Sequence, residues 1–173
     1  PSYYYLKRID GKMPKIPVKL SVAFDTRKKK FCAAKIRVLP AHDIRDAKFL
    51  LQHSNPKIAV ADKGYNAEKL YKFAAENNIR LMIPKKSNAK RGFYRKKAQK
   101  KFKIRTYHRR ELVESGNSSI KRKYGSSVSS KTVRTIRTEV YGRLACHNLF
   151  FWLLRLSGQS LNHLKSSSFV FDL

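Results

Sequence analysis

The sequence has 173 residues, which is room for one domain and a tail. Hydrophobic residues make up 42% of it, so a core can be buried and global disorder is excluded. Lys and Arg number 40 against 11 Asp and Glu, which gives a formal net charge of +29. Such a charge allows acidic ligands, membrane surfaces and nucleic acids as partners, and nucleic acid is the commonest of the three.

Membrane-spanning and disulfide-rich classes are excluded. The longest apolar stretch without a charge, Leu144 to Leu154, has 11 residues, whereas a spanning helix needs about 20. Cys32 and Cys146 are too far apart for a Cys-x-x-Cys zinc site, and we expect both to be buried, reduced thiols. No signal peptide opens the sequence, so we expect a cytoplasmic, nucleoid-associated protein.

The first predicted elements form a hairpin. Residues 18–24 alternate in polarity as a strand does, residues 25–30 are a charged turn, and residues 31–39 return as a second strand. Pro40 ends that strand, and a helix is predicted from Asp43 to about His53.

A strand, a helix and another strand follow with short links. The apolar run 58–61 predicts a strand ending at Asp62, and Gly64 predicts a turn directly after it. A helix capped by Asn66 and a strand over 79–83 come next. Strand–helix–strand connections of this kind are right-handed and join parallel strands. The order of elements therefore predicts an α/β fold with a mixed sheet.

Residues 85–105 differ from the rest of the chain. Eleven of these 21 residues are Lys or Arg and none is acidic. Phe93, Tyr94 and Phe102 are interleaved with them and could stack on bases. A solvated charged face is the alternative, but the density of charge favours contact with nucleic acid. The lysines expected to contact DNA are Lys96, Lys97, Lys100 and Lys101.

Two helices and a tail are predicted after this basic stretch. A helical segment begins at about Thr106 and is weakened by the Ser-Gly-Asn-Ser-Ser run at 115–119, and a flexible link follows at 125–130. Apolar residues spaced by three and four predict a long helix over 132–156. The Ser-rich residues 157–173 are expected to be a loose tail.

Asp62 is the first candidate for chemistry. An acid at the carboxyl end of a buried strand lies where open α/β sheets bind their ligands, and the turn at Gly64 lets backbone approach it. The alternative is an Asp that only shapes the turn.

Glu114 is the second candidate. Tyr107, Arg110, Glu114 and Lys121 are spaced by three, four and seven residues, which places them in a stripe of roughly 60° on one helix face. A plain ion pair between Glu114 and Arg110 would also explain the spacing. Two carboxylates on separate elements suit magnesium. A two-metal site usually needs a third carboxylate, and by position the remaining candidates are poor: Asp10, Asp25, Asp43 and Asp46.

The same residues resemble the DDE-type transposases of insertion sequences. Ala61-Asp-Lys-Gly-Tyr65 is similar to the Asp-x-Gly-Tyr segment around their second aspartate. The spacing Tyr107-x2-Arg110-x3-Glu114-x6-Lys121 matches their Tyr-Arg-Glu-Lys signature completely. The resemblance covers roughly residues 2–154 and extends to Arg143 and to the triplet His147-Asn148-Leu149.

The resemblance implies a ribonuclease H-like fold that cuts and joins DNA with two Mg²⁺ or Mn²⁺ ions. It implies Asp62 and Glu114 as catalytic metal ligands, and Tyr107, Arg110 and Lys121 as residues that hold DNA phosphates. Its domain would span residues 1–156, with 85–105 as a DNA-contacting insertion. A homodimer in a transposition complex is a further implied partner.

One departure from the family concerns the first aspartate. In the family it lies on the first strand, ahead of a Ser-x-Tyr-Tyr-like segment, and here the similar Ser2-Tyr-Tyr-Tyr5 stands at the start of the sequence. We therefore expect that the first strand is missing, that the hairpin has an exposed edge, and that the chain binds DNA without cutting it alone. A nucleic-acid-binding protein without catalysis is the alternative.

Overall fold

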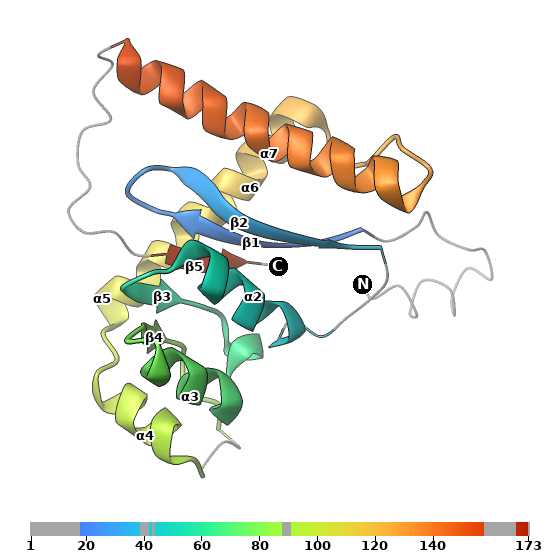
Figure 1. Ribbon diagram of the computed structural model, residues 1–173. Helices are drawn as coiled ribbons and strands as arrows, with labels where there is room; N and C mark the ends of the chain where they lie inside the picture. The colour runs from blue at the N-terminus through green and yellow to red at the C-terminus, as the bar shows by residue number, and fades with distance from the viewer. Residues whose placement is uncertain (1–17, 39–41, 43, 88–90, 158–168, 173) are drawn as a thin grey trace.

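A computed structural model describes residues 18–38, 42, 44–87, 91–157 and 169–172. Its centre is one five-stranded mixed sheet with the strand order β2-β1-β5-β3-β4 (Figure 1). β1 pairs antiparallel with β2 and β5, whereas β3 pairs parallel with β5 and β4. The strands are β1 (Lys19–Asp25), β2 (Lys30–Arg37), β3 (Ile58–Val60), β4 (Arg80–Met82) and β5 (Phe169–Asp172).

The predicted hairpin and the predicted parallel pair are both confirmed. Asp25 holds the tight turn between β1 and β2, because its Oδ1 accepts hydrogen bonds from the backbone N–H groups of Arg27 at 2.8 Å and Lys28 at 3.0 Å. β3 and β4 run parallel, with Ala59 opposite Leu81. The α/β class with a mixed sheet is therefore confirmed.

β5 was not predicted. The Ser-rich sequence over 157–173 predicts a loose tail, yet residues 169–172 form a strand between β1 and β3. Val22 to Asp25 of β1 therefore have strand partners on both sides. The exposed hairpin edge that we expected is absent over these residues.

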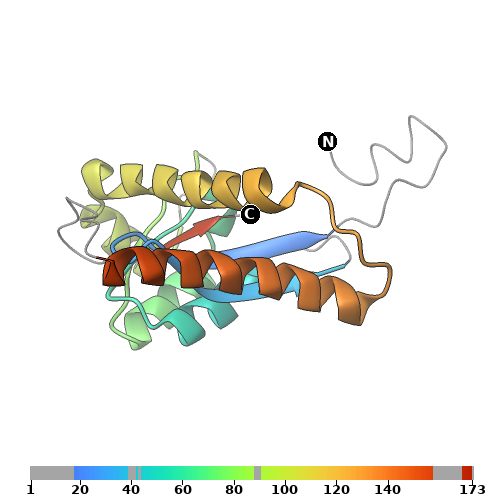
Figure 2. The ribbon, with the colours of Figure 1, turned by 90° about the horizontal axis from the view of Figure 1, so that it is seen from above.

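Helices cover both faces of the sheet. α2 and α3 lie on one face with α4 packed beside α3, and α6 and α7 lie on the other (Figures 1 and 2). Two short elements, α5 and the 3₁₀ turn η2, lead into α6, and a 3₁₀ turn η1 follows β3. The bounds are η1 (Lys63–Tyr65), α2 (Ile44–Ser54), α3 (Glu68–Glu76), α4 (Phe93–Lys100), α5 (Ile104–Tyr107), η2 (His108–Arg110), α6 (Glu111–Tyr124) and α7 (Val133–Leu156).

The core is divided between the two faces by the alternation of the strands. Ala23 of β1 packs with α2 and α3 in one cluster, whereas Val22 and Phe24 pack with α6 and α7 in the other. Ala59 and Val60 of β3 divide in the same way. Successive side chains of a strand point to opposite faces, so burial on both faces fixes the register of β1 and β3.

Two helices differ from the prediction, α3 at its start and α6 in its middle. α3 begins after Ala67, whose side chain makes no capping hydrogen bond, so Asn66 is not its N-cap. α6 continues unbroken through residues 115–119. A Cβ at Gly116 would lie 3.1 Å from the Phe24 ring, so this glycine lets α6 approach the sheet closely. Packing of the helix face thus outweighs the weak helix propensity of the Ser-Gly-Asn-Ser-Ser run.

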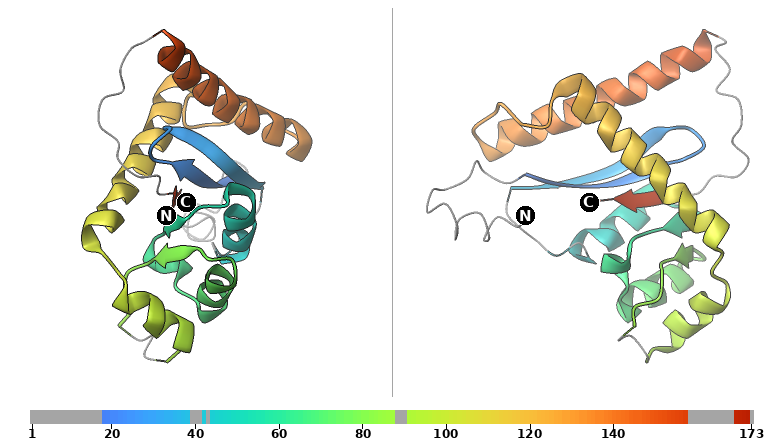
Figure 3. Two further views of the ribbon diagram at one scale, coloured as in Figure 1. Left: turned by 60° about the vertical axis from the view of Figure 1, so that its left-hand side comes forward. Right: turned by 180° about the vertical axis from the view of Figure 1, so that it is seen from behind.

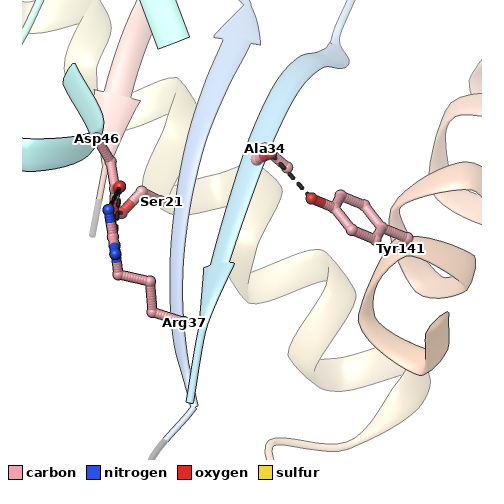
Figure 4. Close-up of polar contacts among 5 residues, drawn as sticks. All are labelled: Ser21, Ala34, Arg37, Asp46 and Tyr141. Atoms are coloured by element: carbon pink, nitrogen blue, oxygen red, sulfur yellow. Dashed lines mark hydrogen bonds and ion pairs between the residues drawn. The ribbon is translucent and has the colours of Figure 1, made fainter. Parts of the chain in front are cut away.

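α7 is tied to both the sheet and the link before it. Tyr141 donates a hydrogen bond to the Ala34 carbonyl of β2 at 3.2 Å (Figure 4). Arg143 donates to the carbonyls of Gly125 at 3.1 Å and Ser127 at 2.9 Å, and it pairs with Glu139. The link expected to be flexible is therefore hydrogen bonded to α7.

A buried ion pair joins the hairpin to α2. Arg37 Nε lies 2.9 Å from Asp46 Oδ1 and its Nη2 lies 2.6 Å from the same oxygen (Figure 4). Ser21 Oγ donates to the other carboxylate oxygen at 3.2 Å. Asp46 is only 1% exposed, so these contacts satisfy a charge that would otherwise be costly to bury.

Two expectations about cysteines and membranes have different outcomes. Cys32 is half-buried, but Cys146 is exposed on α7, so the expectation of a buried thiol is wrong there.

Among the described helices, none combines the length and the apolar character needed to cross a bilayer.

Candidate active site and nucleic-acid interface

Asp62 lies where β3 ends and η1 begins. The sheet ladder continues as far as Ala61, whose N–H donates to the Met82 carbonyl at 3.1 Å. Asp62 is half-buried, and its Oδ1 accepts from the backbone N–H of Lys63 at 2.7 Å. Asp62 therefore caps the 3₁₀ turn through one of its two carboxylate oxygens, which is the turn-shaping role given above as the alternative.

Tyr107, Arg110 and Glu114 form a connected row, although a 3₁₀ turn separates α5 from α6. Arg110 Nη2 lies 2.7 Å from Glu114 Oε1, and the Tyr107 hydroxyl is hydrogen bonded to Arg110. The plain ion pair that the spacing allowed is thus present. Half of the Glu114 side chain is still exposed to solvent, so the pair leaves the carboxylate accessible.

Tyr107 connects this row with Asp62. Burial is the main cause that raises the pKa of Tyr107, and the Arg110 guanidinium opposes it. The negative charges of Asp62 and Glu114 raise the same pKa further, because both lie within electrostatic reach of one hydroxyl. The two carboxylates, 52 positions apart in the sequence, therefore act electrostatically on the same tyrosine, which packs on the α6 face of the sheet.

Packing explains why the row is held at this position. Val113, next to Glu114, is fully buried against the sheet, and Ile120 continues the same apolar face of α6. Phe102 lies 5.8 Å from Tyr107 between ring centroids, and both rings pack on the core. Lys121 is exposed seven residues beyond Glu114, which is about 10.5 Å along the helix.

Carboxylate oxygens are the donors that Mg²⁺ and Mn²⁺ prefer, so the chemistry of Asp62 and Glu114 fits such an ion. One oxygen of each is already engaged, Asp62 Oδ1 by the Lys63 N–H and Glu114 Oε1 by Arg110. Across the described residues, no group of three His, Cys, Asp or Glu side chains is close enough to hold a metal. These two residues alone would offer fewer carboxylates than two divalent ions require.

The basic stretch folds into α4, with its lysines outside. Lys96, Lys97, Lys100 and Lys101 are all exposed at the helix or its end. Of the three aromatic residues proposed to stack on bases, Phe93 is the most exposed, at 71%. Tyr94 and Phe102 are half-buried and pack against the two core clusters, which leaves less of their rings accessible than that of Phe93.

An acid from another helix fixes α4. Glu68 of α3 accepts hydrogen bonds from the backbone N–H groups of Tyr94 at 2.8 Å and Arg95 at 3.3 Å. Gly92 makes this approach possible, since a Cβ there would lie 2.1 Å from the Glu68 carboxylate. Its φ of +121° also favours glycine. Glu68 therefore orients the basic helix by satisfying the first N–H groups.

Sequence reasoning did not connect α4 with residues of α3 and β4. A cleft of about 310 Å³ between these elements brings Tyr71 and Arg80 next to Lys97 and Lys101. The only signal of this cleft in the sequence is Arg80, a cation at the start of a short buried strand. The cleft extends the basic surface of α4 onto the edge of the sheet.

Comparison with known proteins places the whole arrangement in a family. No curated protein and no solved structure matches the sequence. The family described as "Transposase DDE domain" matches residues 10–149, which is more than half of the chain. This range includes the strand-end Asp62, the Tyr107–Glu114 row and the basic helix α4. The chain therefore belongs to the DDE transposase domain family.

Proposed function

We propose that this domain has a ribonuclease H-like fold and performs metal-dependent DNA strand cleavage and transfer at insertion-sequence ends. Membership of the family implies DNA transposition and DNA binding. The observation that supports the site is that the charges of both Asp62 and Glu114 reach the Tyr107 hydroxyl and raise its pKa. In this proposal, Asp62 and Glu114 hold Mg²⁺ or Mn²⁺.

The roles of the other residues follow from charge and reach. A divalent ion held by Asp62 and Glu114 would supply Lewis-acid activation of the attacking water or 3′-hydroxyl and stabilisation of the leaving oxygen. Arg110 and Tyr107 lie beside Glu114 and would bind the phosphate oxygens on which negative charge develops. Lys121 would contact a neighbouring phosphate along α6.

We further propose that α4 binds the flanking DNA. Its exposed lysines and Phe93, with no acid exposed on the helix itself, form a surface that attracts phosphates whatever the sequence. We assign the helix to this general affinity, because lysines that face solvent select charge and not base identity.

A nucleic-acid-binding protein without catalysis remains the alternative function, and metal dependence separates the two. The assay incubates the chain with DNA carrying the ends of its own element, in Mg²⁺ and in Mn²⁺. Any cleavage that is observed should be reduced at least about a hundredfold by each of Asp62→Asn and Glu114→Gln, a loss of about 2.7 kcal/mol in transition-state stabilisation.

Glu111→Gln is the matched control. Glu111 is 75% exposed, one turn before Glu114 on the same helix, and its contact is with His108. Cleavage should be unchanged in this variant. Metal-independent binding with no cleavage in any protein would favour the non-catalytic alternative. The expectation that the chain alone does not cut holds only if no third carboxylate joins Asp62 and Glu114.

A further inference from the structure

The C-terminal half of α7 exposes large apolar side chains on its outer face. Leu149, Trp152, Leu153 and Leu156 are each more than half exposed, and their spacing of three and four residues places them on one side of the helix. The buried residues of α7 lie on the opposite side, where the helix packs on β2 and α6. Figures 1 and 3 show α7 at the outer edge of the molecule, with those elements on its inner side. The four side chains are therefore open to solvent within the part of the chain that the structure describes.

Small residues continue the same face toward the start of α7. Gly142, Ala145 and Cys146 are exposed and, at about 100° per residue, lie within roughly 60° of Leu149 around the helix. With the four large residues they form what we call the outer stripe. Glycine is unfavourable inside a helix, and a Cβ at Gly142 would meet nothing within 4 Å. Packing within the described chain gives no reason for this glycine, whereas the close approach of another helix would give one.

The outer stripe is complementary to itself when two copies of α7 run antiparallel. With a twofold axis at Leu149, a residue before the axis lies level with a residue the same distance after it in the other copy. The facing pairs, each within one residue of exact register, are Gly142 with Leu156, Ala145 with Trp152, and Cys146 with Leu153. Small residues thus face large ones, which lets two helices interdigitate closely. A parallel pair would instead place large on large and small on small.

The charge of the chain also favours this stripe as the place where two copies meet. A net charge of +29 makes most contacts between copies repulsive. Between residues 142 and 156 the only Lys, Arg, Asp or Glu residues are Arg143 and Arg155. Each lies about 120° around the helix from Leu149, outside the stripe. Two copies joined along the outer stripe therefore bury no charge.

We propose that the outer stripe of α7 is a homodimer interface, on which a second copy of this chain packs antiparallel across Leu149. A hollow of about 540 Å³ beside Leu153, Leu154 and Leu156 lies at the end of the stripe that the first half of the partner's helix would cover. The dimer requires neither DNA nor a metal ion. One helix from each copy makes a small interface, so we expect a dissociation constant in about the micromolar range.

Sedimentation velocity of the full chain without DNA tests the proposal. The protein is treated with nuclease and measured at about 1–100 µM, in about 0.15 M and about 1 M NaCl. We expect a concentration-dependent dimer that is at least as stable at the higher salt, because salt screens the repulsion and leaves the apolar contact. Association through bound nucleic acid would weaken with salt instead. A monomer at every concentration, or a dimer lost at high salt, would overturn the proposal.

Three variants locate the interface. Leu149→Glu brings two carboxylates together at the twofold axis and should weaken the dimer at least about tenfold. Ile104→Glu is the control, because Ile104 is 60% exposed on α5 and should leave the dimer unchanged. Gly142→Leu adds apolar area yet should also weaken it, since the larger side chain meets Leu156 of the other copy. Circular dichroism checks the fold of each. A tighter dimer in Gly142→Leu, or no change in Leu149→Glu, would overturn the antiparallel packing.

A cross-link tests the direction of the two helices. In a chain with Cys32→Ser and Cys146→Ser, Leu149→Cys should form a disulfide between copies on oxidation, because the two substituted positions meet at the axis. Gly142→Cys in the same background should not, since its two positions are about 21 Å apart along the antiparallel helices. A parallel pair would cross-link through both positions. Equal reaction at both positions, or reaction at neither, would contradict the proposed interface.

Discussion

Asn148 of α7 and Phe31 of β2 are joined by two hydrogen bonds of 2.8 Å in opposite directions. The Asn148 amide oxygen accepts from the Phe31 N–H, and its nitrogen donates to the Phe31 carbonyl. β2 is an edge strand of the sheet. A side chain amide here takes the place of a neighbouring strand and satisfies backbone groups that would otherwise be open.

Replacing Asn148 with Ala should destabilise the domain by about 1–3 kcal/mol, because the largely buried N–H of Phe31 loses its acceptor. Urea denaturation followed by circular dichroism measures the change. Arg137→Ala is the control, since Arg137 is exposed on the same helix. Equal losses in the two variants would show that the amide has no special role.

His147 should make stability depend on pH. It is buried against Phe24, Phe31 and Phe151, and burial lowers its pKa, with the Lys123 charge acting in the same direction. The stability that its neutral form contributes is fully present above the unfolded-state pKa of about 6.5. It is lost as the pH falls from there through the lower folded-state pKa.

The measurement for His147 is the free energy of unfolding in urea between pH 8 and pH 5. The chain with His147→Phe should lose less stability over this interval than the unsubstituted chain. His108→Gln removes an exposed imidazole and should follow the unsubstituted chain. A steeper loss of stability in His147→Phe would show that the pKa of His147 is not lowered in the folded protein.

Breaking the Arg37–Asp46 pair should be costly. Asp46→Ala leaves the partly exposed Arg37 guanidinium and the buried Ser21 hydroxyl without their acceptor, and we expect a loss of about 1–3 kcal/mol. The double substitution Arg37→Met with Asp46→Leu removes both charges and should cost less than Asp46→Ala alone. Thermal denaturation of the unsubstituted chain, Arg37→Met, Asp46→Leu and the double variant gives the coupling energy, and simple additivity would show that the pair is not coupled.

The exposed lysines of α4 should set the salt dependence of DNA binding. Replacing Lys96, Lys97, Lys100 and Lys101 with Gln should reduce the slope of log affinity against log salt by about 0.9 for each phosphate that is no longer neutralised. The weakening should be the same for all DNA sequences. The control replaces Lys57 and Lys69, which are exposed outside α4. A slope unchanged in the α4 variant would mean that the helix is only a solvated face.

Local patterns predicted the elements whose partners are close in sequence. Alternation located the hairpin, and apolar spacing located α7 to within a residue or so at each end. The signature spacing also placed Arg110 and Glu114 in contact, because residues four apart on a helix are neighbours. It is periodicity, a local property, that carries this information.

Contacts between distant segments could not be predicted in the same way. Four residues in a Ser-rich stretch have too little pattern to indicate β5, and only pairing with β1 and β3 makes them a strand. The cap that Glu68 gives to α4 depends on how α3 packs. The approach of Asp62 to Tyr107 likewise depends on α6 lying across the sheet.

The position of β5 also has a consequence for how the chain reaches its native state. The strand is central in the sheet but the most C-terminal of the five, and Phe169 pairs with Asp25 from the opposite part of the sequence. During synthesis β1 and β3 emerge long before the strand that joins them, so each has an unpaired side until then. Such non-local pairing slows folding and prolongs the time in which nascent chains can associate through these sides. We therefore expect a folding rate and a yield of soluble protein that respond more strongly to changes in β5 than its four residues would suggest.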